Sequence, residues 1–211
     1  MILVLNNSES APIGALDINV TSRSTTWSRG LSPFIIKGGN TWTDDFAENV
    51  ENLWQFTKVY ECHVDSNNEP NEDFFIWMKR GWKSKVGIRY PMGKGAIPLY
   101  SYWNGKKYGY LDAKEKLYVK MYYRSVKTTD AYKHLEELYK ECLKTKTILV
   151  LRDFDAYNHI NLKLTPYEVM RHPTKKFGHG FVLMFMLMGL LDERGNFIHE
   201  LKKDIKDIKF F

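Results

Sequence analysis

Three residues of one predicted helix carry side chains that are well suited to chemistry. Glu51, Gln55 and Lys58 follow one another at intervals of four and three residues, so a helix places them on one face. A carboxylate beside apolar neighbours is partly desolvated, which raises its proton affinity and makes it a usable general base. Lys58 is suited to hold a ligand phosphate or to keep the carboxylate ionised, and Trp54 to stack on a planar ring.

The same spacing also fits the solvated face of an amphipathic helix, because Glu and Lys side chains are mostly exposed. Both interpretations stay open at this point. The helix itself is predicted from about residue 44 to residue 60, with Thr43 or Asp44 as its cap. Its core face is expected to comprise the apolar or small residues at helical spacing, which are Phe46, Val50, Leu53, Trp54 and Thr57.

Other elements must position this helix. Residues 1–43 are rich in Ser, Thr, Gly and Asn and predict short strands and loops, and Asn104-Gly105 predicts a hairpin over 97–111. Helices are expected over 112–124, after Thr128 or Thr129, after Thr165 and over 180–191, with a buried strand over 147–154. The elements do not alternate regularly, so we predict an α+β fold. One domain is expected over residues 1–211, with a core at about 21–191 and a lysine-rich tail at 192–211.

Composition narrows the function classes. The chain carries a net charge of +6 over 211 residues, which favours anionic partners but falls short of a dedicated DNA-binding domain. The motifs GxxxxGK[ST], GxGxxG, HExxH and GxSxG are absent, and the six histidines have no metal-ligand spacing. We therefore expect no metal and no cofactor.

The sequence also bears on location. The longest apolar run, residues 181–191, is too short to cross a bilayer and predicts a buried helix. The N-terminus lacks the basic region of a signal peptide, and Cys62 and Cys142 are expected to be free thiols of a reducing compartment. We predict a cytoplasmic protein with no membrane association.

The order of several segments resembles the NADAR superfamily, whose α+β domains include riboflavin-pathway N-glycosidases and enzymes that remove ADP-ribose from guanine. The matching segments are Leu31-Ser32-Pro33-Phe34, residues 51–60, residues 141–145 followed by 148–151, and residues 178–184. Together they span about residues 21 to 191. Asn52 stands where the family usually has histidine. The chain is also similar to small accessory proteins of T-even-type bacteriophages, some of which counter host toxins that ADP-ribosylate DNA.

The resemblance implies hydrolysis of a ribosyl C–N bond in an ADP-ribose-containing nucleotide or in ADP-ribosylated DNA. Glu51 would stabilise the cationic transition state or activate water. The ligand would also be bound by cationic, aromatic and polar side chains, which are Lys58, Arg23, Arg29, Trp54, Trp42, Gln55, Asp153 and Asp155. For the two aspartates, which follow the predicted strand, a turn or helix-cap role is the alternative.

Two other functions stay open. The first is a catalytically silent protein that sequesters ADP-ribose-like ligands or a host protein. The second is plain nucleic-acid binding, which rests on the net charge and the aromatic content alone.

Overall fold

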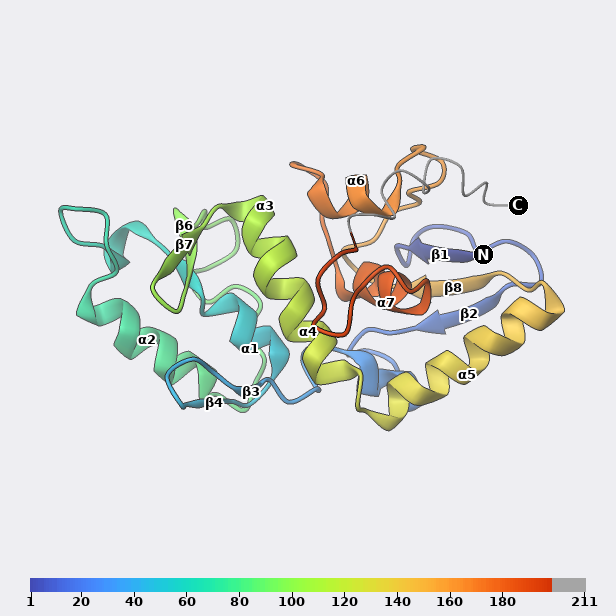
Figure 1. The fold of residues 1–211 in the computed structure, drawn as a ribbon, viewed down its shortest axis with the longest axis horizontal. Helices are drawn as coiled ribbons and strands as arrows, with labels where there is room; N and C mark the ends of the chain where they lie inside the picture. Colours follow the sequence, from blue (N-terminus) through green and yellow to red (C-terminus); the bar gives the residue numbers. More distant parts are fainter. Residues whose placement is uncertain (199–211) are drawn as a thin grey trace. The chain divides into compact units, whose positions relative to one another are not determined.

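The structure, a computed structural model, describes residues 1–198 and divides the chain into two compact units. The sheet unit comprises Met1–Ser32 and Val126–Phe211, and the aromatic unit comprises Pro33–Ser125. We use the second name because five of the six tryptophans lie in it. Helices and small sheets occur in the structure, which confirms the α+β class (Figure 1). The single domain over residues 1–211 stays a prediction.

The sheet unit is built around β8 (Leu149–Arg152), the middle strand of a three-stranded parallel sheet. On one side β1 (Ile2–Leu5) pairs with it, and on the other side β2 (Leu16–Asn19) does. All four β1 residues are buried, as are the first three of β8, which fits continuous apolar strands in a covered parallel sheet. The strand predicted over 147–154 is therefore confirmed at its centre.

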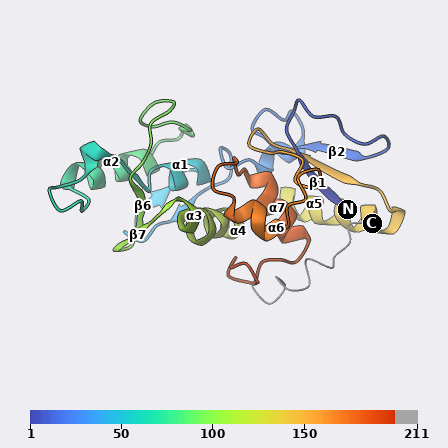
Figure 2. The same ribbon diagram turned by 90° about the horizontal axis from the view of Figure 1, so that it is seen from above.

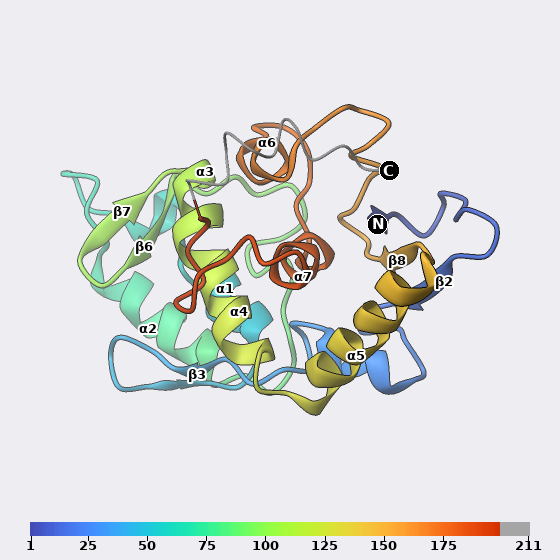
Figure 3. The ribbon, with the colours of Figure 1, turned by 45° about the vertical axis from the view of Figure 1, so that its right-hand side comes forward.

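Helices complete the sheet unit. They are α5 (Asp130–Thr145), α6 (Pro166–Arg171), α7 (His179–Leu187) and the 3₁₀ helix Trp27–Leu31. In Figure 3, α5 lies alongside β8 and β2. The residues of α7 from His179 to Phe185 are all buried, so the predicted buried helix is confirmed, although it ends at Leu187. Gly189, with a φ of +67°, follows that end, as is common after a helix.

The aromatic unit opens with a short antiparallel pair, β3 (Gly39–Asn40) with β4 (Phe46–Ala47). The helix α1 spans only Val50–Gln55. The prediction of a helix from 44 to 60 was therefore wrong at both ends. Residues 46–47 pair as a strand, Asp44 has a φ of 60°, and β5 (Lys58–Val59) pairs with β6 (Tyr100–Trp103). Sheet pairing thus uses the backbone groups that a longer helix would have needed.

The cap and the core face of α1 also differ from the prediction. The cap is neither Thr43 nor Asp44: the side chain of Asn49 accepts the N–H of Asn52 at 2.8 Å. Phe46 is 43% exposed and lies outside the core, because it belongs to β4. The other four predicted core residues are buried, namely Val50, Leu53, Trp54 and Thr57.

The aromatic unit continues with α2 (Glu72–Trp82) and the 3₁₀ helix Glu61–His63. After α2, residues 83–99 form a long connection to β6, seen in Figure 2 as the green arc beside α1 and α2. The hairpin of β6 with β7 (Lys106–Tyr108) turns at Asn104 and Gly105, both with positive φ, as predicted. One continuous helical stretch follows, made of α3 (Tyr110–Ala113), the π-helix Lys114–Tyr118 and α4 (Val119–Val126).

Two caps in the sheet unit agree with the sequence, whereas those of α1 and α3 in the aromatic unit do not. Thr129 caps α5 by accepting the N–H of Tyr132, and Thr165 forms a capping box with Glu168. The helix predicted over 112–124 begins two residues earlier, at Tyr110, and Gly109 is its cap residue. Cys62 and Cys142 are free thiols. Of the predicted lysine-rich tail at 192–211, residues 199–211 lie outside the described residues.

Candidate functional site

The three residues that the spacing aligned on α1 form a hydrogen-bonded row, which we call the Glu51 row. Gln55 Nε2 donates to Glu51 Oε1 at 2.9 Å, and Lys58 Nζ donates to Gln55 Oε1 at 2.6 Å. Glu51 is 6% exposed and Gln55 is 8% exposed. The alternative of a solvated helix face is therefore wrong for these two residues. The row is a buried polar network in which the central amide uses both of its ends.

The start of α1 is fixed by the segment that precedes it. The N–H of Glu51 donates to the carbonyl of Pro33 at 2.9 Å, and that of Val50 donates to Ile36 at 3.0 Å. These bonds satisfy two of the N–H groups that the first turn of a helix leaves without intrahelical partners. They also hold the Pro33-Phe34 turn against the residue proposed to do chemistry.

The two tryptophans considered as stacking partners lie in different surroundings. Trp54 is 9% exposed, contacts the Tyr118 ring at 5.3 Å and has the Lys58 ammonium 5.2 Å from its ring centroid. Trp42 instead belongs to a cluster with Phe75, Tyr102 and Trp103. Trp54 therefore adjoins the Glu51 row through Lys58. The buried Trp42 Nε1 has no hydrogen-bond partner within residues 1–198.

Asn52, the residue that differs from the family pattern, anchors a loop. It is fully buried, and its Nδ2 donates to the carbonyls of Ser84 and Val86, each at 2.9 Å. Its Oδ1 accepts the N–H of Ile88 at 2.8 Å. One side chain thus satisfies three backbone groups of the connection that follows α2. Sequence reasoning missed this role, since the loop groups lie more than thirty positions away.

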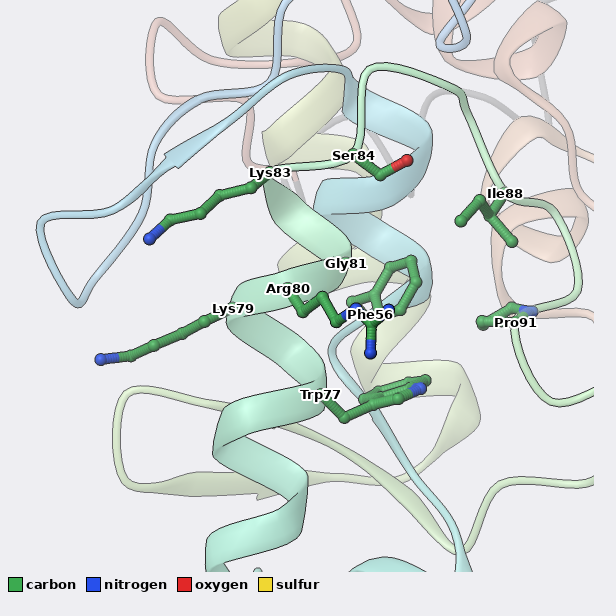
Figure 4. Close-up of a pocket in the computed structure, with 9 residues that line it drawn as sticks. All are labelled: Phe56, Trp77, Lys79, Arg80, Gly81, Lys83, Ser84, Ile88 and Pro91. Atoms are coloured by element: carbon green, nitrogen blue, oxygen red, sulfur yellow. The ribbon is translucent and has the colours of Figure 1, made fainter.

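Beside this anchored loop lies a cavity of about 770 Å³, which we call the α2 pocket. Figure 4 shows the Phe56 and Trp77 rings in it, with Ile88 and Pro91 across from them. Its other lining residues belong to the end of α2 and to the residues just after it: Lys79, Arg80, Gly81, Lys83 and Ser84. No helix or strand is predicted from the sequence over residues 74–78, so sequence reasoning missed this site. Reading these residues as a helix would have placed Trp77 one turn from Arg80 and Gly81.

In the sheet unit, Asp153 is a helix cap. Its Oδ2 accepts the N–H of Gly180 at 2.8 Å and lies 3.0 Å from His179 Nδ1, while its Oδ1 accepts the N–H of Asp155 at 3.2 Å. Burial alone would raise the pKa of Asp153, but His179 and the hydrogen bonds outweigh burial and lower the pKa to about 2. Residue 178 is necessarily glycine, because a Cβ there would lie 2.2 Å from Asp153 Oδ2. The helix-cap alternative therefore describes this residue.

The remaining predicted ligand residues are also in the sheet unit. Asp155 lies 3.7 Å from Lys176 Nζ, and the exposed Arg23 guanidinium stacks 5.1 Å from the Phe154 ring centroid. Arg29 is exposed on the 3₁₀ helix Trp27–Leu31. The structure thus brings Glu51, Gln55, Lys58 and Trp54 together in the aromatic unit. The two arginines and the two aspartates lie in the sheet unit, and the placement of the two units relative to each other is not determined.

Comparisons of the chain with family models, curated proteins and solved structures returned no match. Within the described part of the chain, no helix is long and apolar enough to span a membrane. In those same 198 residues, no group of three His, Cys, Asp or Glu side chains is placed to hold a metal ion. The candidate site is therefore defined by its own geometry, and the family resemblance stays a prediction.

Proposed function

We propose that the chain is an N-glycosidase-like hydrolase of a ribosyl C–N bond, with Glu51 as its catalytic carboxylate. One observation carries the proposal: a buried carboxylate is held by an amide, which is itself held by a lysine. Burial of polar groups is costly unless every group is bonded, and side-chain hydrogen bonds link the three members of this row. A buried polar row of this kind is a candidate for electrostatic catalysis.

The chemistry follows from the charge that develops during the reaction. Cleavage of a ribosyl C–N bond builds positive charge at the anomeric carbon, and an ionised carboxylate in a low-dielectric site stabilises it strongly. Gln55 fixes one oxygen of Glu51, which sets the orientation of the carboxylate without neutralising it. Lys58 adds a positive charge next to Trp54, a combination that suits a phosphate beside an aromatic base.

The resembling segments pair up within each unit, which supports the proposal. In the aromatic unit, Pro33 bonds directly to Glu51, so the first two segments adjoin. In the sheet unit, Asp153, two residues after Leu151, accepts the N–H of Gly180, so the last two segments also adjoin. By this resemblance we infer a substrate that carries ADP-ribose on a nucleic-acid base, and a counter-defence role in a phage.

Asn52 favours a second candidate, a catalytically silent binding protein. The position that is histidine in the resembling family is here an amide committed to three loop hydrogen bonds. A proton-transfer role for that position is therefore excluded, because an amide does not titrate. Such a protein would keep Lys58 and Trp54 for a ligand and use Glu51 only to orient Gln55.

Release of ADP-ribose from single-stranded DNA that carries ADP-ribosyl-guanine tests both candidates. Glu51→Gln keeps the size of the side chain and removes its charge, so we expect the rate to fall at least about a hundredfold. Glu61→Gln is the matched control, because Glu61 is an exposed carboxylate of the same unit, and its rate should stay within about twofold of wild type.

Binding of free ADP-ribose, measured by calorimetry, separates the two candidates. An enzyme releases ADP-ribose in a manner that depends on Glu51. A silent binder releases none, yet it binds ADP-ribose saturably and loses affinity when Lys58 is changed to methionine. Absence of both release and binding would refute both candidates.

A further inference from the structure

The α2 pocket has a chemistry of its own, which does not depend on the Glu51 row. Its aromatic wall consists of Phe56 and Trp77, whose ring centroids are 4.5 Å apart at a tilt of 48°. Ile88 and Pro91 line it from the loop, so the cavity lies between rings and an apolar edge (Figure 4). A volume of about 770 Å³ is in the range of small-molecule sites and exceeds what one base requires.

The cations around the pocket are not equivalent. Lys79 and Lys83 form ion pairs with Asp45 at 3.7 and 3.3 Å, and in Figure 4 their ammonium groups point away from the rings. Arg80 lines the same pocket and is exposed, and no carboxylate among residues 1–198 forms an ion pair with it. The guanidinium is thus available to an anion, and its planar fork suits a phosphate.

The loop adds positive charge without any negative charge. Residues 83–99 contain four cationic residues and no Asp or Glu: Lys83, Lys85, Arg89 and Lys94. At seventeen residues the connection exceeds the usual length of a loop without secondary structure, and such loops are usually functional or disordered. Here Asn52 pins its first part, and Gly87 fits closely against the Phe34 ring, which leaves an ordered wall for a ligand.

We propose that the α2 pocket binds a nucleotide unit, with its base on Trp77 and Phe56 and its phosphate on Arg80. The half-buried Trp77 ring is backed by the buried Phe56 ring and lies beside Arg80, which forms no ion pair among residues 1–198. An aromatic ring beside an available arginine is the feature by which proteins hold bases and backbone phosphates without reading sequence. An apolar ligand alone would not use the Arg80 guanidinium, and a phosphate alone would not use the Trp77 ring that lines the cavity. The bound nucleotide is either part of a single-stranded nucleic acid or free, and both ligands share this chemistry.

The test measures fluorescence anisotropy of a labelled single-stranded thymidine oligonucleotide of about 12 nucleotides, the scale of such sites. Arg80→Ala should weaken binding about tenfold, and Arg80→Lys should recover part of that loss because the charge remains. Trp77→Leu should also weaken binding about tenfold through lost stacking. Because Trp77 also packs on Phe74 and His63, thermal melting must show that this variant folds.

The control is Lys106→Ala, since Lys106 is exposed in the same unit, away from the α2 pocket lining. Lys106→Ala should change the affinity for the oligonucleotide by less than about twofold at moderate salt, because it removes only one charge outside the pocket lining. Competition by thymidine monophosphate identifies the source: displacement of the label supports a free nucleotide, and failure to displace supports a strand. The proposal is overturned if wild type does not bind at low salt, or if Arg80→Ala and Lys106→Ala bind alike.

This proposal is independent of the proposed glycosidase activity. Glu51→Gln should bind the oligonucleotide as wild type does, because Glu51 does not line the α2 pocket. Loss of oligonucleotide binding in Glu51→Gln would show that the Glu51 row and the α2 pocket form one site, and would contradict the proposal.

Discussion

Among residues 1–198, each unit contains one carboxylate that is almost entirely buried, and the two are held in different ways. Asp153 is bonded by two backbone N–H groups and lies 3.0 Å from His179 Nδ1. Glu51 is bonded by the side chain of Gln55, which is bonded in turn by Lys58. Backbone donors, such as the Gly180 N–H at the start of α7, stabilise a fold, whereas side-chain donors can rearrange around a ligand. Burial alone therefore does not identify a catalytic carboxylate, and the partners of the carboxylate must be known.

The largest effect that we expect from this contrast is on stability at Asp153. Asp153→Ala should lower the free energy of unfolding by about 3–5 kcal/mol, because it removes the charge beside His179 and the acceptor of the Gly180 N–H. Urea denaturation followed by circular dichroism measures it. A loss below about 1 kcal/mol would show that the cap is dispensable, and Asp153 would again be a ligand candidate.

Asn52→Ala should cost less, about 2 kcal/mol, since it frees three backbone groups of a loop that solvent can partly satisfy. The same substitution should raise hydrogen exchange at residues 84–88 while leaving α5 protected. Exchange measured by mass spectrometry checks this. Unchanged exchange in the loop would show that Asn52 is not its anchor.

The loss of stability at low pH tests the lowered pKa of Asp153. Its pKa of about 2 in the native state lies below the ordinary value of 3.8, so the unfolded chain binds the proton more readily. The resulting stability is present above about pH 4 and is lost as the pH falls towards 2, by about 2 kcal/mol in total. Asp153→Ala should lack this part of the acid loss, as urea titrations at each pH would reveal. The same loss of stability between pH 4 and pH 2 in wild type and in Asp153→Ala would contradict the low pKa.

The smallest effect should come from Glu51 itself. Glu51→Gln should change the free energy of unfolding by less than about 1 kcal/mol, because the amide can still accept from Gln55. Leu53→Ala is the matched control on the same helix: Leu53 is fully buried, so a loss of about 2–5 kcal/mol is expected from the cavity. A loss from Glu51→Gln as large as that from Leu53→Ala would make Glu51 a structural carboxylate, like Asp153.

Much of the local structure followed from local signals. Three predictions from signals that act within four residues were confirmed: a helix capped by Thr128 or Thr129, a helix after Thr165, and a hairpin turn at Asn104-Gly105. The length of α1, in contrast, could not be predicted from local signals. Its apolar spacing continues past both true ends, but strand pairing with residues 39–40 and 100–101 takes the flanking backbone. Helix length was therefore decided by partners that the spacing does not contain.

The candidate site divides in the same way. Helical spacing alone was enough to align Glu51, Gln55 and Lys58, because that spacing is a property of the backbone. Their burial, the anchoring role of Asn52 and the existence of the α2 pocket came only from tertiary contacts, since the loop groups that Asn52 binds are 32 to 36 residues away. The parallel sheet is the extreme case, with β1 and β2 meeting β8 across more than a hundred residues. Residue spacing predicts which side chains share a face of a helix or strand, whereas the packing partners of that face depend on the tertiary structure.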